Sequence, residues 1–166
     1  MTPVKDSLVV FLEGAKVNFK MYGFITPVFG CNIDGEPMIM PIIFRKPADK
    51  ENFRQKILDM ISVNKLKEFV FVSEAWTAVS KKEDMSDIQE WMTENGSLEG
   101  HPNREEIVSV LYCSATEEIQ YTSRIIRGKI AILSEWQVDK RSGQFEISEL
   151  GTRFQGLFAK GKSGQN

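Results

Sequence analysis

Histidine and cysteine are scarce in this chain of 166 residues, and the motifs of several large enzyme classes are missing. The one histidine, His101, excludes metal centres that are built from several histidines. The sequence contains no GxGxxG, P-loop, GxSxG or HExxH motif and no paired CxxC. Dinucleotide chemistry and P-loop nucleotide chemistry therefore have no support. We expect neither a bound metal nor a cofactor.

Long apolar runs are also missing. The run from Leu8 to Leu12 is broken by Glu13, and no small-residue cleavage site follows it, so a signal peptide is not indicated. No segment approaches the ~20 apolar residues that a membrane-spanning helix needs. Cys31 and Cys113 fall in separate predicted strands, where reduced and structural thiols are expected. The sequence thus predicts a soluble, cytoplasmic protein with no membrane partner.

The overall composition is that of an ordinary globular protein, with 42% hydrophobic and 27% charged residues. A chain of this length can bury an adequate core without disulfides or metals. We expect one domain over residues 1–158, followed by a flexible C-terminal tail over residues 159–166.

The net charge of −2 conceals an uneven distribution. Residues 83–118 contain ten acidic residues and one basic residue, a net charge of −9, whereas residues 121–166 contain eight basic and four acidic residues, a net charge of +4. We favour two solvated surfaces that attract each other weakly across the fold, and a bipolar surface that meets a charged partner is the alternative. Nucleic-acid binding by the basic part is not favoured, because no aromatic residues are interleaved with its bases.

The N-terminal part predicts a helix and then a hairpin. Thr2-Pro3 is a helix start and Gly23 a helix stop. Asp34-Gly35 indicates a type I′ turn, which pairs Ile33 with Glu36. Three prolines in this hairpin place it towards a sheet edge. The apolar stripe of the helix is Val4, Leu8, Phe11, Leu12, Ala15, Phe19 and Tyr22, and the core face of the hairpin is Ile25, Pro27, Phe29, Cys31, Ile33, Met38, Met40, Ile42 and Phe44.

The remaining chain predicts one more long helix and several strands. A helix capped by Asp49 ends near Asn64, and the strand 67–78 follows it. Residues 79–104 form a long insertion with a short helix whose apolar face is Ile88, Trp91 and Met92. After the insertion comes a strand over 105–113 and then a hairpin over 117–126 and 129–139, which turns at residues 127–128. A last strand lies near Phe145 and Ile147. It is followed by a weak helical pattern formed by Leu150, Phe154, Leu157 and Phe158.

This order of elements predicts an α+β fold. We expect a mostly antiparallel sheet with two main helices packed on one face and a long, partly helical insertion. In the hairpin 117–139, apolar and polar residues alternate, so we expect one face to be buried and the other to be exposed to solvent.

The residue that stands out is Glu74, which interrupts the apolar strand 67–78. Burying an ionised carboxylate is costly unless it is paired, hydrogen-bonded or neutral. One interpretation is a general acid or base, or a ligand anchor, with Trp76 beside it on the same strand face. The other, which we favour, is a structural carboxylate that accepts backbone N–H groups or pairs with an arginine.

His101 and Arg104 are the other candidate site residues, because they lie just before a strand that is expected beside Glu74. They predict a cluster of Glu74, His101 and Arg104 at the end of the sheet. The alternative, which we favour, is an ordinary turn in which Arg104 pairs with Glu105 or Glu74. Glu90 and Glu94 could join His101 as metal ligands, but the solvent-facing side of an amphipathic helix is the simpler interpretation.

The strand Val70–Trp76, the polar insertion and the sequence His101-Pro102-Asn103-Arg104 with Glu106 resemble a loosely defined group of uncharacterised small proteins from bacteria and phages. The likeness covers mainly residues 50–113. It implies no known reaction, substrate or cofactor, so it assigns no catalytic residue. It does imply that Glu74, Trp76, His101 and Arg104 act as one unit.

Two functions from different classes remain open. The favoured one is a non-enzymatic binding or accessory protein, whose protein partner meets the acidic 79–106 region or a sheet-edge strand, with a homo-oligomer through that edge as one form. The alternative is a small hydrolase or transferase that acts on a small anionic ligand. In it, Glu74 and His101 would serve as acid and base, and Arg104 would hold the anion.

Overall fold

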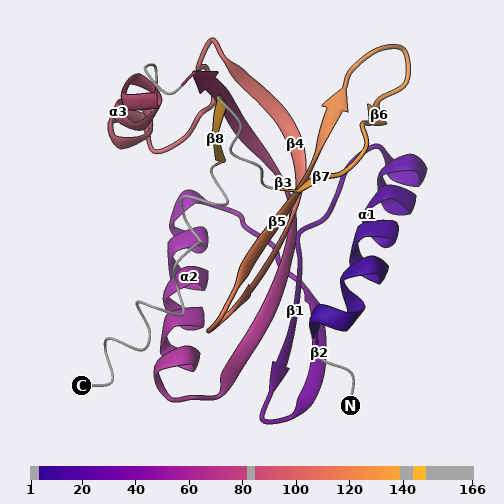
Figure 1. Cartoon of the computed structure of the whole chain (residues 1–166), viewed down its shortest axis with the longest axis vertical. Helices are drawn as coiled ribbons and strands as arrows, with labels where there is room; N and C mark the ends of the chain where they lie inside the picture. Colours follow the sequence, from indigo (N-terminus) through magenta and orange to yellow (C-terminus); the bar gives the residue numbers. More distant parts are fainter. Residues whose placement is uncertain (1–3, 82–84, 139–143, 149–166) are drawn as a thin grey trace.

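The computed structural model describes residues 4–81, 85–138 and 144–148, and it is an α+β fold with an antiparallel sheet (Figure 1). Its strands have the order β2-β1-β3-β4-β5-β6, with β7 on β5 and β8 on β3. The helical elements are η1 (Val4–Ser7), α1 (Leu8–Tyr22), α2 (Pro47–Ser62) and α3 (Met85–Asn95). The strands are β1 (Val28–Ile33), β2 (Glu36–Pro41), β3 (Leu66–Lys81), β4 (Arg104–Ser114), β5 (Glu118–Ile126), β6 (Ile132–Leu133), β7 (Gln137–Val138) and β8 (Gln144–Ser148).

The strand that contains Glu74 is central, as its apolar sequence predicted. The first half of β3 lies between β1 and β4, Thr77 and Ala78 lie between β4 and β8, and residues 79–81 pair with β8. Neighbouring residues of β3 point to opposite faces of the sheet, so both faces of this strand need a cover.

The two long helices provide that cover from opposite sides, and the prediction of both helices on one face was wrong. Ile57 and Ile61 of α2 pack with Phe69 and Phe71, whereas α1 packs with the alternate residues of β3. Figure 1 shows α1 and α2 on either side of the sheet. The physical reason is that β3 is apolar on both faces, and one layer of helices can dehydrate only one of them.

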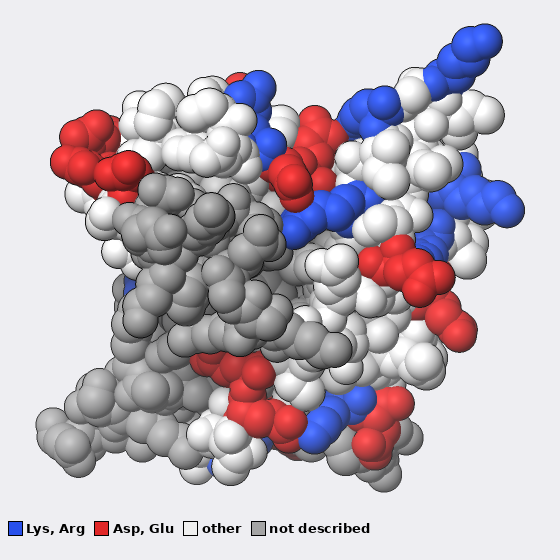
Figure 2. All heavy atoms as spheres, turned by 45° about the horizontal axis from the view of Figure 1, so that its top comes forward, with Lys and Arg blue, Asp and Glu red and all other residues white. Residues whose placement is uncertain are grey.

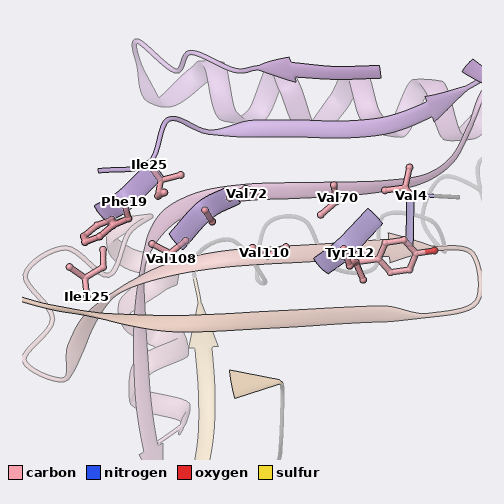
Figure 3. Packing of buried hydrophobic residues seen from close by; sticks show 11 residues of the cluster. Val4, Phe19, Ile25, Val70, Val72, Val108, Val110, Tyr112 and Ile125 are labelled. Atoms are coloured by element: carbon pink, nitrogen blue, oxygen red, sulfur yellow. The ribbon is translucent and has the colours of Figure 1, made fainter. Parts of the chain in front are cut away.

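The core on the α1 side contains the buried residues in Figure 3. In it, α1 approaches the sheet so closely that a side chain on Gly30 of β1 would collide with neighbouring atoms. A Cβ atom there would lie 2.6 Å from the ring of Phe11 and 2.9 Å from Val70, which is fully buried. Glycine at this position therefore sets the distance between helix and sheet.

The β1–β2 hairpin has the register that Asp34-Gly35 predicted, with Ile33 opposite Glu36 and Cys31 opposite Met38. Asp34 and Gly35 have φ values of 50° and 88°, as a type I′ turn requires. Six residues of the predicted core face pack on the α2 side: Phe29, Cys31, Ile33, Met40, Ile42 and Phe44. The prediction was wrong for Met38, which is exposed, and for Ile25, which lies before β1 and belongs to the core on the α1 side.

The edge strand β2 has few free N–H groups. Ile42 donates its N–H to the carbonyl of Pro27, and because hydrogen-bonded pairs alternate along an antiparallel ladder, the nitrogens of Pro37, Ile39 and Pro41 face away from β1. Two of these three residues are prolines and carry no N–H. Prolines at such positions protect an edge against the addition of another strand.

The predicted turn at residues 127–128 was wrong. Ile126 pairs with Ile132, so five residues separate the strands, and Ile130 and Ile132 are exposed. Arg-Gly lacks the Asn or Asp that favours a two-residue turn. Ser134 also interrupts the returning strand, because its hydroxyl accepts the N–H of Arg124 at 2.7 Å in place of a backbone group.

The middle of the predicted polar face of β5 is buried, whereas Glu118 at its start is exposed and Arg124 is half-buried. Gln120 and Thr122 are buried, and the side-chain amide of Gln120 donates to the hydroxyl of Ser109 on β4 at 3.1 Å. Side chains that satisfy one another can occupy a buried face, which the alternation of polar and apolar residues alone does not reveal.

The insertion forms its expected helix, α3. Ile88, Trp91 and Met92 pack with Ala78 and Leu98 in a small separate core. None of the helices in the described ranges is long and apolar enough to cross a membrane. The helical pattern of Leu150 to Phe158, the predicted domain end at residue 158 and the predicted tail lie outside the described residues.

Candidate functional site

Glu74 is a structural anchor for the exit of helix α1. Its Oε1 accepts the backbone N–H of Ile25 at 2.7 Å, two residues after Gly23 ends the helix in a left-handed conformation. Burial raises the pKa of the Glu74 carboxyl, and the Ile25 N–H and Arg127 oppose this shift. Of the two alternatives that the sequence left open, the contact matches the carboxylate that accepts a backbone N–H.

A second carboxylate, Glu68, anchors the beginning of the same segment. Its two oxygens accept the backbone N–H of Val4 and the hydroxyl of Tyr112, the latter at 2.7 Å. Glu68 and Glu74 are six residues apart on one face of β3, so the two glutamates hold residues 4 and 25 at the two ends of η1 and α1. The sequence interpretation missed Glu68, although its even spacing from Glu74 was a usable signal.

Trp76, Arg104 and His101 are brought together at the far end of β3. The guanidinium carbon of Arg104 lies 5.2 Å from the centre of the Trp76 ring, and its Nη1 donates to the carbonyl of His101 at 3.1 Å. A guanidinium over an aromatic face is a favourable cation–π contact. Arg104 thus contacts two of the other three residues of the predicted unit, Trp76 and His101.

The His101 side chain is buried and serves the loop that it belongs to. Its ring meets that of Trp91 edge to face at 5.0 Å, and its Nδ1 accepts the N–H of Asn103 at 3.0 Å. Its backbone bonds to Leu98 and Arg104 close the turn before β4. One ring nitrogen is therefore occupied by a local bond, and the ring packs against the small core of α3.

Glu74 stays apart from His101 and Arg104, although Trp76 lies two residues from it on the same face of β3. In the register of β3 and β4, Arg104 faces Ala78, and four positions of strand from Glu74 to Ala78 are about 13 Å. No contact between described residues joins Glu74 to His101 or to Arg104. The described residues also hold no group of three or more His, Cys, Asp or Glu side chains that could bind a metal ion.

The acidic and basic segments meet across the β4–β5 pair. Arg124 pairs with Glu105 at 2.7 Å, and Arg127 pairs with Glu106 at 2.8 Å. Figure 2 shows basic and acidic side chains interspersed on the face that it draws. Each pair joins an exposed side chain to a half-buried one, and ion pairs near the surface stabilise a fold only weakly. They match the favoured interpretation of two surfaces that attract each other.

The outer side of α1 carries a second apolar stripe. Val10, Val17 and Met21 are 65%, 57% and 66% exposed, and Gly14 lies in line with them with open space around its missing side chain. Their spacing of i, i+4, i+7 and i+11 places them on one face, opposite the buried Leu8, Ala15 and Phe19. In Figure 1 no other labelled element covers this outer side.

The sequence interpretation assigned only one apolar stripe to this helix and placed Tyr22 in it, whereas Tyr22 is exposed. A signal for the second stripe was present, because α1 has few polar residues and a helix that is apolar all round is usually covered on all sides. We define the outer face of α1 as Val10, Gly14, Val17 and Met21.

No protein-family model, no curated protein and no solved structure matches this chain. The resemblance to small bacterial and phage proteins, and the origin that it implies, therefore stay predictions.

We expect the stability of this protein to depend on pH through Glu74. The native state binds its proton more tightly than the unfolded chain does, because the pKa is raised above its ordinary value of 4.5. This contribution is complete below pH 4.5 and is lost as the pH rises through the native pKa. Glu74→Gln keeps an oxygen for the N–H of Ile25 and removes the charge.

Urea denaturation should be measured from pH 4.5 to above the native pKa of Glu74. As the pH rises, the free energy of unfolding of the wild type should fall relative to that of Glu74→Gln. Glu74→Ala, which leaves the N–H of Ile25 without its acceptor, should be less stable than Glu74→Gln at every pH. A difference between wild type and Glu74→Gln that does not change with pH would contradict the raised pKa.

Proposed function

We propose that this chain is a non-enzymatic interaction protein whose partner binds the outer face of α1. The observation that carries the proposal is the row of exposed aliphatic side chains of Val10, Val17 and Met21. Single exposed apolar residues are common on proteins, but a continuous row on one helix face is typical of an interaction site. An amphipathic helix face is a common element of such contacts.

The energetics favour an external partner for this face. The fold uses the opposite side of α1 for its core, and more than half of the surface of Val10, Val17 and Met21 remains exposed. Removing a Val or Met side chain from water contributes about 1.5–3 kcal/mol. Several such residues in one row can support specific binding.

The two surfaces that the sequence favoured for a partner offer less. In the 79–106 region, the apolar residues Ile88 and Leu98 are buried in the core of α3. At the sheet edge, prolines remove two of the three outward N–H groups of β2. The enzyme alternative is not favoured either, because Glu74 and His101 each have a separate structural contact.

Site-directed photo-crosslinking tests the proposal. A photoreactive phenylalanine derivative would replace Val17 in the full chain, which would be expressed in the cells that naturally contain it and then irradiated. We expect a covalent adduct of defined mass. The matched control carries the same residue in place of Lys56, an exposed position of α2.

Adducts at position 17 that are missing at position 56 support the proposal. The same adducts at both positions, or none at position 17 when the variant is folded by circular dichroism, would remove it. Because Val17 is a surface residue of the helix, its replacement should leave the unfolding temperature unchanged within a few degrees.

A further inference from the structure

We infer that the partner of the outer face of α1 is the same face of a second copy of this chain, with the two helices packed antiparallel. The inference depends on the proposed function and names the occupant of its site. It follows from the order of apolar residues along the helix, from the position of two charges beside them, and from the exposed residues near its end.

The apolar row is symmetric about its own centre. Val10 and Met21 lie equally far from the point between residues 15 and 16, and so do Gly14 and Val17. In an antiparallel pair related by a two-fold axis at that point, Val10 faces Met21 of the second copy, and Gly14 faces its Val17. Such an isologous contact requires a surface that is complementary to itself.

Glycine provides the shape that this contact needs. A Cβ atom at Gly14 would have no other atom within 4 Å, so the backbone is open to the outside at this point. The branched side chain of Val17 from the second copy can enter this gap. The two-fold axis repeats this contact, so that each Val17 enters the gap at Gly14 of the other copy. Two such contacts let the helices approach closely.

Charge complementarity selects the antiparallel orientation. Glu13 and Lys20 are exposed, and they are seven residues apart, so they lie along the same flank of the row. The two-fold axis brings Glu13 of each copy beside Lys20 of the other. A parallel pair would place the same charges on opposite flanks, where no ion pair forms.

Both charges are available for this role. Neither Glu13 nor Lys20 forms an ion pair with another described residue, whereas Lys16, which lies between them, donates to the carbonyl of Ser134 at 3.1 Å and stands over the Trp136 ring. The lysine that the fold uses is therefore different from the one that the second copy would meet.

Exposed apolar residues near α1 enlarge the surface. Phe24 follows the helix and is exposed, and the loop that contains Ile130 and leads into β6 presents Ile130 and Ile132. Stable dimers bury about 1,200–2,000 Å² in total, which is more than one short helix pair provides. A stable dimer would therefore have to bury Phe24, Ile130 and Ile132 in addition to the outer face of α1.

Sedimentation velocity of the purified full chain, from low micromolar to submillimolar concentration, tests the inference. We expect a monomer–dimer equilibrium for the wild type. Val17→Glu places a charge at the centre of the contact and should give a monomer throughout. Lys56→Glu introduces the same residue at an exposed position of α2, away from the outer face of α1, and should leave the equilibrium unchanged.

A charge exchange tests the orientation. Glu13→Lys and Lys20→Glu alone should each weaken the dimer about tenfold, because each creates two like-charge contacts across the axis. The two changes together restore opposite charges and should return the dissociation constant to near the wild-type value. Circular dichroism of each variant confirms that its helix content is unchanged.

A wild type that stays monomeric, or a double variant that is no tighter than either single one, would overturn the inference. Either result would exclude the second copy as the partner without excluding another partner at the outer face of α1. Crosslinks from position 17 to a different protein only would keep the proposed function and exclude the second copy. An absence of crosslinks from that position would remove both.

Discussion

Phe71→Ala should lower the free energy of unfolding by about 3–5 kcal/mol, the usual cost of removing a buried phenylalanine ring. Phe71 is 1% exposed, on the α2 side of the central strand. Its ring centre lies 5.7 Å from that of Phe53 and 6.3 Å from that of Phe44. Alanine would leave a cavity that these rings, fixed on two other segments, cannot fill.

Urea denaturation measures this loss, and Phe24→Ala is the matched control. Phe24 is 57% exposed, so the same truncation should change the stability by less than about 1 kcal/mol. Phe71→Leu should lie between the two, because it keeps part of the volume. Equal losses for Phe71→Ala and Phe24→Ala would mean that α2 does not pack on this face of β3.

Glu68→Ala should lower the free energy of unfolding by about 2–4 kcal/mol, because it leaves two donors without an acceptor at a cost of about 1–3 kcal/mol each. These donors are the backbone N–H of Val4 and the hydroxyl of Tyr112, which is buried. Burial and the bond to Glu68 both raise the pKa of Tyr112. The variant should therefore also lower the pKa of this tyrosine.

Urea denaturation, amide hydrogen exchange in α1 and a spectroscopic titration of tyrosine report these effects. Glu68→Gln is the matched variant, since its oxygen can accept the N–H of Val4 while its amide donates to the oxygen of Tyr112. It should lose less than Glu68→Ala. Glu117→Ala removes an exposed carboxylate, paired with Lys5, and should cost less than about 1 kcal/mol.

Equal stability of Glu68→Ala and Glu117→Ala would contradict the anchoring role of Glu68. So would unchanged hydrogen exchange at the start of α1, because release of Val4 should first loosen the residues next to it.

Much of the fold could be predicted from local signals. Asp34-Gly35 has the backbone preference that one turn type requires, so the register of the first hairpin was predictable. The continuous apolar run of β3 indicated a central strand, and the apolar spacing of Ile88, Trp91 and Met92 indicated the face of α3 that is buried. In each case the information lies within a few neighbouring residues.

The errors occurred where the decisive partner is remote. Arg127-Gly128 was a plausible turn, but the pairing of β5 is decided by Ser134 and Leu133. The side of the sheet on which each helix packs depends on how both faces of β3 are covered together. Periodicity indicates that a helix has an apolar face, and it does not indicate which surface will meet it.

In the candidate site, too, local features were predictable from the sequence and remote contacts were not. Face parity correctly placed Glu74 and Trp76 on one side of β3, and proximity along the chain placed His101 near Arg104. The donor that binds Glu74 is Ile25, which is 49 residues away in the chain and belongs to a segment with no apparent relation to it. Glu74, which looked chemically unusual, and Glu68, which the sequence interpretation missed, thus hold the two ends of one helical segment.

By itself, the sequence determined most of the elements, the turn of the first hairpin and many of the residues with an apolar environment. These depend on dihedral preference and on side-chain spacing along a few turns or strands. Only the tertiary structure decided that α1 and α2 cover opposite faces, that Glu68 and Glu74 bind the ends of one helical segment, and that Val10, Val17 and Met21 remain outside. Burial is a property of the assembled surfaces, and the same apolar residue is covered or exposed according to which face of its helix meets the sheet.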